Sequence, residues 1–111
     1  MDTLDQYRNY IHKIISKYAS IPHIHGQIKS IVIVSEDRNH FLLMNEGWDG
    51  KKHIHHCLIH VQILNEKLWI YFDGTEDGIT DELVAAGVPK DKIVLAFHPP
   101  YVRQHTGYAV A

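Results

Sequence analysis

The segment between Lys52 and His60 contains the residues whose types and spacing come closest to a metal site. It carries five potential zinc ligands: His53, His55, His56, Cys57 and His60. Side chains alternate between the two faces of a strand. An extended conformation therefore places His53, His55 and Cys57 on one face, and His56 and His60 on the other. Three donors on one face would suit zinc only if they converged on one point.

Such convergence is difficult within a single strand. Neighbouring side chains on one face lie about 6.6 Å apart and run roughly parallel, so three in a row do not easily surround a tetrahedral ion. A fourth ligand would have to come from elsewhere, such as His25 or His98. We interpret these histidines as residues of a sheet face or an interface, and we predict neither a bound metal nor a cofactor.

Cys57 is the only cysteine of the chain, so an internal disulfide is excluded. A cysteine nucleophile needs a neighbouring base, and His55 would share its face of the strand. Cys57 also leads into the apolar residues Ile59 and Val61, which favours a core position. The chain contains no Walker loop and no GxGxxG, CxxC or GxSxG motif. The sequence therefore predicts no catalytic residues and a protein that is not an enzyme.

A short acidic segment, Asp73–Gly78, has the composition of a calcium loop but not its pattern. It lacks the alternating oxygen ligands and the bidentate Glu that close an EF-hand site. Gly74 and Gly78 are typical turn residues, and the acids suit the positive N-terminus of a following helix. The functional alternative is an isolated cation site or a docking point for a partner, formed by Asp73, Thr75, Glu76 and Asp77.

Two further regions are candidates for contact with a partner. Trp48 and Asp49 lie in a predicted turn, where a tryptophan would be available as an interface anchor. The stretch after Phe97 is too rich in aromatic and apolar residues for a frayed end, so we expect it to be docked. It could tether the sheet, or it could present His98, Tyr101 and Arg103 to a partner.

Composition describes one globular domain over residues 1–111. The chain is 45% apolar and 22% charged, and its net charge is −2 with neutral histidines. This balance is that of a folded protein, and it provides no global positive field for DNA. The chain has no apolar run near the roughly 20 residues that span a bilayer, no signal peptide at its start and no need for an oxidising compartment. We expect a cytoplasmic protein without membrane contact.

The clearest predicted element is an N-terminal helix over residues 3–18. Apolar residues recur there at steps of three and four, which is the pattern of one helical stripe. The stripe comprises Leu4, Tyr7, Ile11, Ile14, Ile15 and Tyr18. Pro22 lies just beyond the predicted end, where proline is common.

Four strands are predicted after this helix. The β-branched run 31–34 and the segment 41–44 flank a polar turn at 36–39, which indicates a hairpin. A turn at 48–51 precedes the long extended segment 52–63, and a turn at 64–66 precedes the strand 67–72. The connections are too short for crossover helices, so the strands form an antiparallel meander.

The remainder completes an α+β fold. Ile79, Leu83 and Val84 predict a short helix that stops at Gly87, because glycine after the last turn is a common helix stop. A fifth strand is possible over 93–97, ended by Pro99.

Several segments, taken in order, resemble the XisI family, the fdxN element excision controlling factors of cyanobacteria. They are Asn45–Gly50, Cys57–Val61, Asp73–Ile79, Ala86–Lys90, Phe97–Pro100 and Thr106–Val110. The resemblance begins at the helix segment Leu4–Arg8 and covers essentially the whole chain. The departure is the segment Lys51–His56, which is richer in histidine than the family pattern.

The resemblance implies a role in the programmed removal of a DNA element during heterocyst differentiation. In that system a separate site-specific recombinase cuts and rejoins DNA, and XisI-like proteins are associated with XisH, a nuclease-like companion. The implied function is non-catalytic control of excision through an XisH-like partner, with any contact to DNA made indirectly through the recombinase complex. An antitoxin-like pairing with an XisH-type nuclease is the alternative within the same family.

Other hypotheses come from the residues themselves. Direct DNA binding, as a recombination directionality factor, would use Lys51 and Lys52 with the neighbouring histidines as a basic patch. A metal-dependent enzyme would use the histidine cluster. A small meander with open edges also tends to pair with a second copy, so we expect a homodimer.

Overall fold

The long N-terminal helix predicted from the apolar stripe is present. The computed structural model describes residues 3–23 and 26–111, and helix α1 spans Thr3–Ala19. Tyr7, Ile11, Ile14 and Ile15 are buried on one side of α1, as their spacing requires. His25, considered above as a fourth metal ligand, lies outside the described residues.

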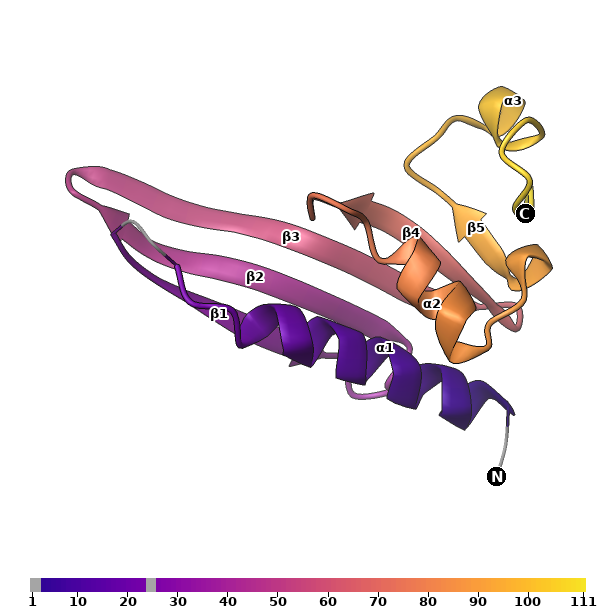
Figure 1. Ribbon diagram of the computed structural model, residues 1–111, viewed down its shortest axis with the longest axis horizontal. Helices are drawn as coiled ribbons and strands as arrows, with labels where there is room; N and C mark the ends of the chain where they lie inside the picture. The colour runs from indigo at the N-terminus through magenta and orange to yellow at the C-terminus, as the bar shows by residue number, and fades with distance from the viewer. Residues whose placement is uncertain (1–2, 24–25) are drawn as a thin grey trace.

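A five-stranded mixed sheet follows α1 (Figure 1). Its strands are β1 (Gln27–Val34), β2 (His40–Asp49), β3 (Lys52–Leu64), β4 (Lys67–Asp73) and β5 (Ile93–Leu95), in that spatial order. The first four strands form the predicted antiparallel meander. The possible fifth strand is real but shorter than residues 93–97, and it runs parallel to β4.

The parallel pairing of β5 depends on the connection that precedes it. Parallel neighbours need a crossover, and the segment between β4 and β5 supplies one with helix α2 (Thr80–Ala86) and the 3-10 helix η1 (Lys90–Lys92). Helix α2 ends at Gly87, as predicted, where φ is 120°. The amide of Gly87 donates to the carbonyl of Val84.

Strands β2 and β3 form a long hairpin that extends past the C-terminal end of α1 (Figure 1). Sequence patterns predicted a strand only over 41–44, because the residues that follow are polar. β2 continues to Asp49 because Asn45 fills an inner position, where it is buried and accepts a 2.9 Å hydrogen bond from the Ser30 hydroxyl of β1.

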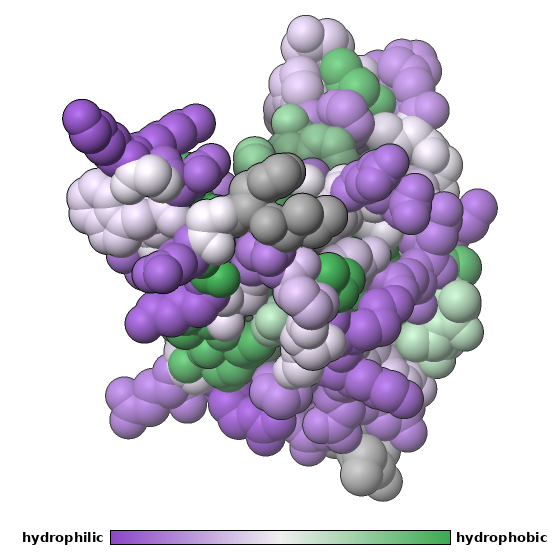
Figure 2. Space-filling model, turned by 60° about the vertical axis from the view of Figure 1, so that its left-hand side comes forward, coloured by the Kyte–Doolittle hydropathy of each residue, from purple (hydrophilic) through white to green (hydrophobic). Residues whose placement is uncertain are grey.

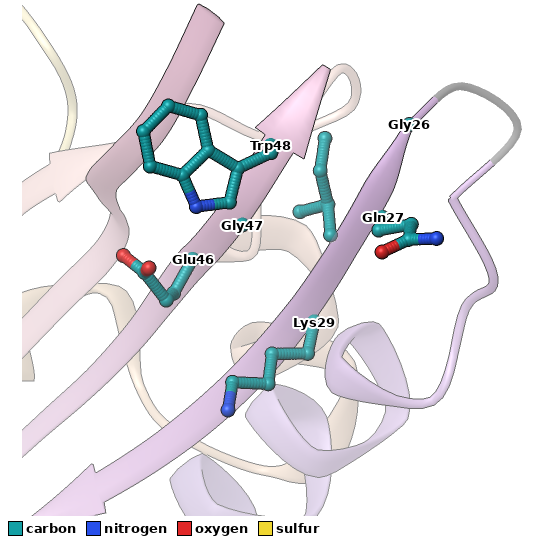
Figure 3. A pocket seen from close by; sticks show the side chains of 7 residues that line it. Gly26, Gln27, Lys29, Glu46, Gly47 and Trp48 are labelled. Carbon is teal, nitrogen blue, oxygen red and sulfur yellow. The ribbon is translucent and has the colours of Figure 1, made fainter. Parts of the chain in front are cut away.

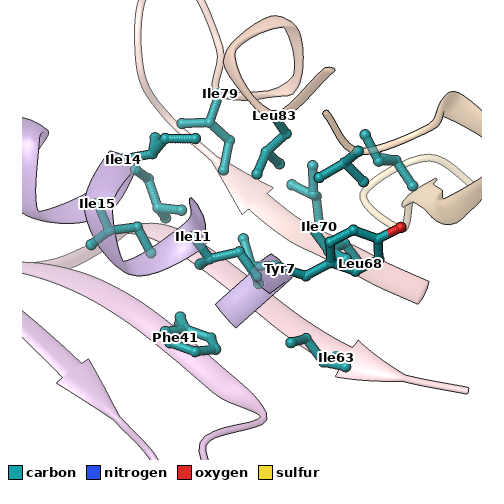
Figure 4. Packing of buried hydrophobic residues seen from close by; sticks show 14 of the residues in the cluster. Tyr7, Ile11, Ile14, Ile15, Phe41, Ile63, Leu68, Ile70, Ile79 and Leu83 are labelled. Carbon is teal, nitrogen blue, oxygen red and sulfur yellow. The ribbon is translucent and has the colours of Figure 1, made fainter. Parts of the chain in front are cut away.

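The hydrophobic core lies between one face of the sheet, here called the inner face, and helices α1 and α2 (Figure 4). The strands contribute Phe41, Leu43, Ile59, Val61, Ile63, Leu68, Ile70, Ile93 and Leu95, and the segment around α2 contributes Ile79, Leu83 and Val88. Burial of these side chains against α1 is the main source of stability of the fold.

The C-terminal segment is docked, as predicted. It contains the short helix α3 (Pro100–Arg103), and Ala109 pairs with Val94 of β5, with the Ala109 amide donating to the Ile93 carbonyl at 2.9 Å. No helix within residues 3–23 or 26–111 is long and apolar enough to cross a membrane.

Candidate functional site

The second face of the sheet, here called the outer face, carries most of the chemistry-bearing side chains. On β2 it comprises His40, Leu42, Met44, Glu46 and Trp48, which alternate with the core residues of the inner face. Helices α1 and α2 both lie against the inner face (Figure 1). Ile31 and Ile33 of β1, which pair with Met44 and Leu42, are therefore exposed on the outer face.

A β-bulge in β3 changes the predicted faces of the histidines. Leu43 pairs with Ile59 and Met44 pairs with Cys57, so Leu58 is the extra residue. Strict alternation placed His60 on the face opposite His53 and His55, and that prediction was wrong. One extra residue reverses the faces, so all three of these histidines lie on the outer face.

The bulge also explains two neighbouring residues. His56 pairs with Asn45 on the inner side of the hairpin, beyond the helices, and its side chain is exposed. Cys57 pairs with the outer residue Met44 and is half-buried, so the predicted core position was wrong. Its thiol donates to the carbonyl of Ile59 at 3.2 Å, and burial raises the pKa of the Cys57 thiol. A raised pKa disfavours the thiolate that a nucleophile requires.

His60 lies in a polar group at the centre of the outer face. Its Nε2 atom is 3.1 Å from Nδ1 of His40, and its ring lies 5.1 Å from that of Tyr71. The Tyr71 hydroxyl donates to Oε1 of Gln62 at 2.6 Å. Burial, and secondarily the neighbouring His40, lower the pKa of His60. His60 is therefore held in its neutral form more strongly in the folded protein than in the unfolded chain.

This shift predicts an acid-sensitive contribution to stability. Because the folded pKa of His60 is lowered, the unfolded chain binds the proton first, and stability falls as pH drops through the unfolded value of about 6.5. We expect His60→Gln to reduce the loss of unfolding free energy between about pH 7.5 and about pH 5.5. Urea unfolding at several pH values measures this pH dependence of the unfolding free energy, with a variant of an exposed histidine, His12→Gln, as control. Equal pH slopes for wild type and His60→Gln would contradict the prediction.

A second group on the outer face, here called the distal cluster, consists of Glu46, Trp48, His53 and His55 near the hairpin turn. Oε1 of Glu46 accepts a hydrogen bond from Nε2 of His53 at 3.1 Å, and Oε2 accepts one from Nδ1 of His55 at 2.5 Å. The Trp48 ring stacks on the His53 ring, with centroids 4.5 Å apart. Sequence reasoning missed Glu46, because only the register of β2 with β3 brings it opposite His55.

A shallow hollow lies beside this cluster, between β1 and β2. Its lining includes Gln27, Lys29, Glu46, Gly47 and Trp48. Figure 3 shows Glu46 and Trp48 extending from β2, with Lys29 on the neighbouring strand β1. When this end of the molecule is turned forward, Figure 2 shows a mostly hydrophilic surface with hydrophobic side chains in small separate patches. The hairpin end is thus a polar surface rather than a continuous apolar groove.

The side chain of Asp73 stabilises its own loop. The Asp73 carboxylate accepts hydrogen bonds from the Thr75 amide at 3.1 Å, the Thr75 hydroxyl at 2.6 Å and the Ile79 amide at 2.7 Å. These bonds fix the turn that leads into α2. Glu76 and Asp77 are exposed and remain available for contact.

The side chain of Arg103 stabilises the C-terminal segment. Its Nε donates to the His98 carbonyl at 2.9 Å, and its other nitrogens lie 3.4 Å from the Ala96 carbonyl oxygen and 3.5 Å from that of Val110. The guanidinium additionally sits over the ring of Trp69. His98 is half-buried against Phe97, whereas Tyr101 is 73% exposed.

The nine predicted partner-binding residues do not form one site. Trp48 and Asp49 lie at the hairpin turn, the residues between Asp73 and Asp77 lie between β4 and α2, and α3 lies at the opposite end of the molecule from the hairpin (Figure 1). His98, the other proposed fourth ligand, lies in the segment between β5 and α3, whereas His53 and His55 lie in β3 near the hairpin turn at the opposite end (Figure 1).

These features define a class of protein: a small α+β domain whose polar clusters lie on an open sheet face. The chain belongs to the XisI family, since it matches the family described as XisI protein over residues 1–110.

Two solved structures from Anabaena variabilis are similar over nearly the full length. An XisI-like protein is 37% identical with a TM-score of 0.90, covering 98% of this chain and 100% of its own. A structure named fdxN element excision controlling factor XisI is 39% identical with a TM-score of 0.85, covering 99% of this chain and 100% of its own. No curated protein matches the chain.

Proposed function

We propose that this chain is a non-catalytic controlling factor for site-specific excision of an fdxN-type DNA element, acting in the cytoplasm by binding an XisH-like protein. The observation that carries this proposal is the 39% identity, over 99% of the chain, to a protein named fdxN element excision controlling factor XisI. The family relationship supports control of excision, and the open outer face supports action through contact with another macromolecule.

The side-chain geometry supports a non-catalytic role. Nucleophilic catalysis needs an activated group with a base in hydrogen-bond reach. The Cys57 thiol instead donates to a backbone carbonyl, and burial raises its pKa. The hydroxyl of Thr75 donates to Asp73 within its own loop. These groups maintain the structure of the domain.

We place the partner-binding surface on the outer face, near the hairpin turn. Trp48 is 53% exposed there, and the exposed Ile31 and Ile33 extend the same face along β1. Exposed tryptophan and isoleucine beside polar groups suit a partner interface, where aromatic anchors contribute most of the binding energy. Asp49 borders this surface. Asp73, Thr75 and Arg103 instead use their polar groups to hold their own segments.

Co-expression with the XisH-like product of a neighbouring gene, followed by size-exclusion chromatography and titration calorimetry, tests the proposal. We expect one complex peak for the wild type and a loss of affinity of about 30-fold for Trp48→Ala, the value for an interface hot spot. Tyr101→Ala, an exposed aromatic at the opposite end, should bind as the wild type does. Two separate peaks for the wild type would refute partner binding, and a defect confined to Tyr101→Ala would refute this placement.

The same chromatography tests the expected homodimer. β1 is an edge strand of the sheet, with β2 on its one paired side. Edge strands tend to be covered by pairing or by symmetric packing. Light scattering of the chain alone should therefore give twice the 12.8 kDa mass of one chain.

A further inference from the structure

The distal cluster brings together three side chains that can each bind a metal ion. Glu46, His53 and His55 each offer one ligand atom, and these atoms all lie within 4.8 Å of one another. The three residues come from two paired strands, with Glu46 directly opposite His55. Cross-strand pairing thus supplies the convergence that residues of a single strand could not achieve.

We propose that Glu46, His53 and His55 form a binding site for a divalent zinc ion on the outer face. Two imidazoles and one carboxylate are the donor set of open zinc sites, in which water or a ligand from another molecule occupies the fourth position. Ligand atoms of tetrahedral zinc lie about 3.3 Å apart, given metal–ligand distances near 2 Å. Oε1 of Glu46 lies 3.1 Å from Nε2 of His53, and Oε2 lies 2.5 Å from Nδ1 of His55. Rotation of the three side chains would bring one Glu46 oxygen and the two nitrogens to tetrahedral separations.

The surroundings favour this small adjustment. The side chains of His53 and His55 are exposed by 48% and 62%, so their rings can shift without disturbing the core. The paired strands hold the backbone, and the Trp48 ring stacked on His53 restricts the orientation of that imidazole. Glu46 is half-buried beneath them, which anchors the carboxylate.

The groups around the cluster determine how zinc binding should depend on pH and on charge. The Glu46 carboxylate accepts a hydrogen bond from each imidazole, so its oxygens already face the two ring nitrogens. Zinc would take the place of the N–H groups that now face this carboxylate, each neutral ring then carrying its proton on the other nitrogen, and competition from protons should weaken binding in acid. The charged groups nearby are Lys29 opposite Glu46 on β1, and Lys52 opposite Asp49 at the turn. The two lysines oppose a cation, and Asp49 partly compensates them.

Calorimetric titration of zinc chloride into the full chain tests the site, with protein purified without a histidine tag and treated with a chelator. We expect one zinc ion per chain. Loss of a ligand in Glu46→Gln, His53→Gln or His55→Gln should weaken binding by more than the roughly 10-fold to 100-fold that second-shell changes cost. The matched control is His56→Gln, which removes a histidine of the same strand from the opposite face and should bind zinc as the wild type does.

Trp48 provides an independent readout of location. Because its ring stacks on His53, zinc should change the Trp48 fluorescence, and Trp48→Phe should lose that change while keeping the stoichiometry. Circular dichroism of each variant verifies folding. The proposal is overturned by no binding at submillimolar zinc, by equal binding in the ligand variants, or by a loss in His56→Gln as large as theirs. It is independent of the XisH-like partner, since every measurement uses zinc and this chain alone.

Discussion

Gly47→Ala should lower the free energy of unfolding by about 3 kcal/mol or more, at the upper end of the cost of overpacking a folded protein. Gly47 lies inside β2, between Ile28 of β1 and Ile54 of β3. A β-carbon added there would lie 1.9 Å from the carbonyl oxygen of Gln27 and 2.7 Å from the α-carbon of Ile28. Both contacts are with backbone, so β1 would have to separate from β2 to relieve them.

Gly50→Ala is the matched control. Gly50 lies in the hairpin turn between β2 and β3, three residues after Gly47, and an added β-carbon would meet nothing within 4 Å. Its φ of 61° is a left-handed backbone conformation, which makes alanine unfavourable by about 1 kcal/mol. The Gly50 variant therefore has this backbone strain but no steric clash. Urea unfolding of both variants distinguishes the two causes. A Gly47 variant no less stable than the Gly50 variant would show that β1 does not approach β2 so closely.

Phe41→Ala should cost about 3 to 5 kcal/mol, the range for truncation of a large buried aromatic. Phe41 is 1% exposed and lies at the start of β2, among the inner-face residues that pack against α1 (Figure 4). It pairs with Val61 on β3, which is also fully buried. Truncation would leave a cavity at the junction of the helix and the two longest strands.

The comparison variant for this prediction is Phe72→Ala. Phe72 is 48% exposed, so its removal returns less apolar surface to water and leaves no enclosed cavity. Its cost should be well below that of Phe41→Ala in the same denaturant titration. Similar losses for both variants would mean that the packing of α1 on β2 is not a main source of stability.

The two stability predictions bear on the surface proposals as well. The outer-face variants used to test partner and zinc binding change exposed or half-exposed side chains, and they should leave the unfolding free energy nearly unchanged. Gly47 is different, because it lies beneath the distal cluster and holds β1 against β2. Loss of zinc binding in Gly47→Ala would therefore report a distorted hairpin and not a missing ligand.

Local patterns in the sequence determined the elements. The apolar stripe of residues 3–18 has the helical period, so α1 could be placed within one residue of its observed end. Short polar turns required the antiparallel meander of β1 to β4, and Gly87 marked the end of α2. The motifs from Asn45 to Val110 also indicated the XisI family, to which the chain belongs.

Tertiary structure alone decided which side chains meet. The bulge at Leu58 is a property of strand pairing and leaves no periodic signal, yet it moves His60 to the outer face and Cys57 out of the core. Glu46 meets His53 and His55 only because β2 and β3 pair in one register, and Arg103 becomes a tether only once the C-terminal segment folds back on the sheet. Hydrophobic periodicity indicates only which residues along one segment share a face. The proposed zinc site depends on neighbours across strands, and these are set by the pairing of two segments in one register.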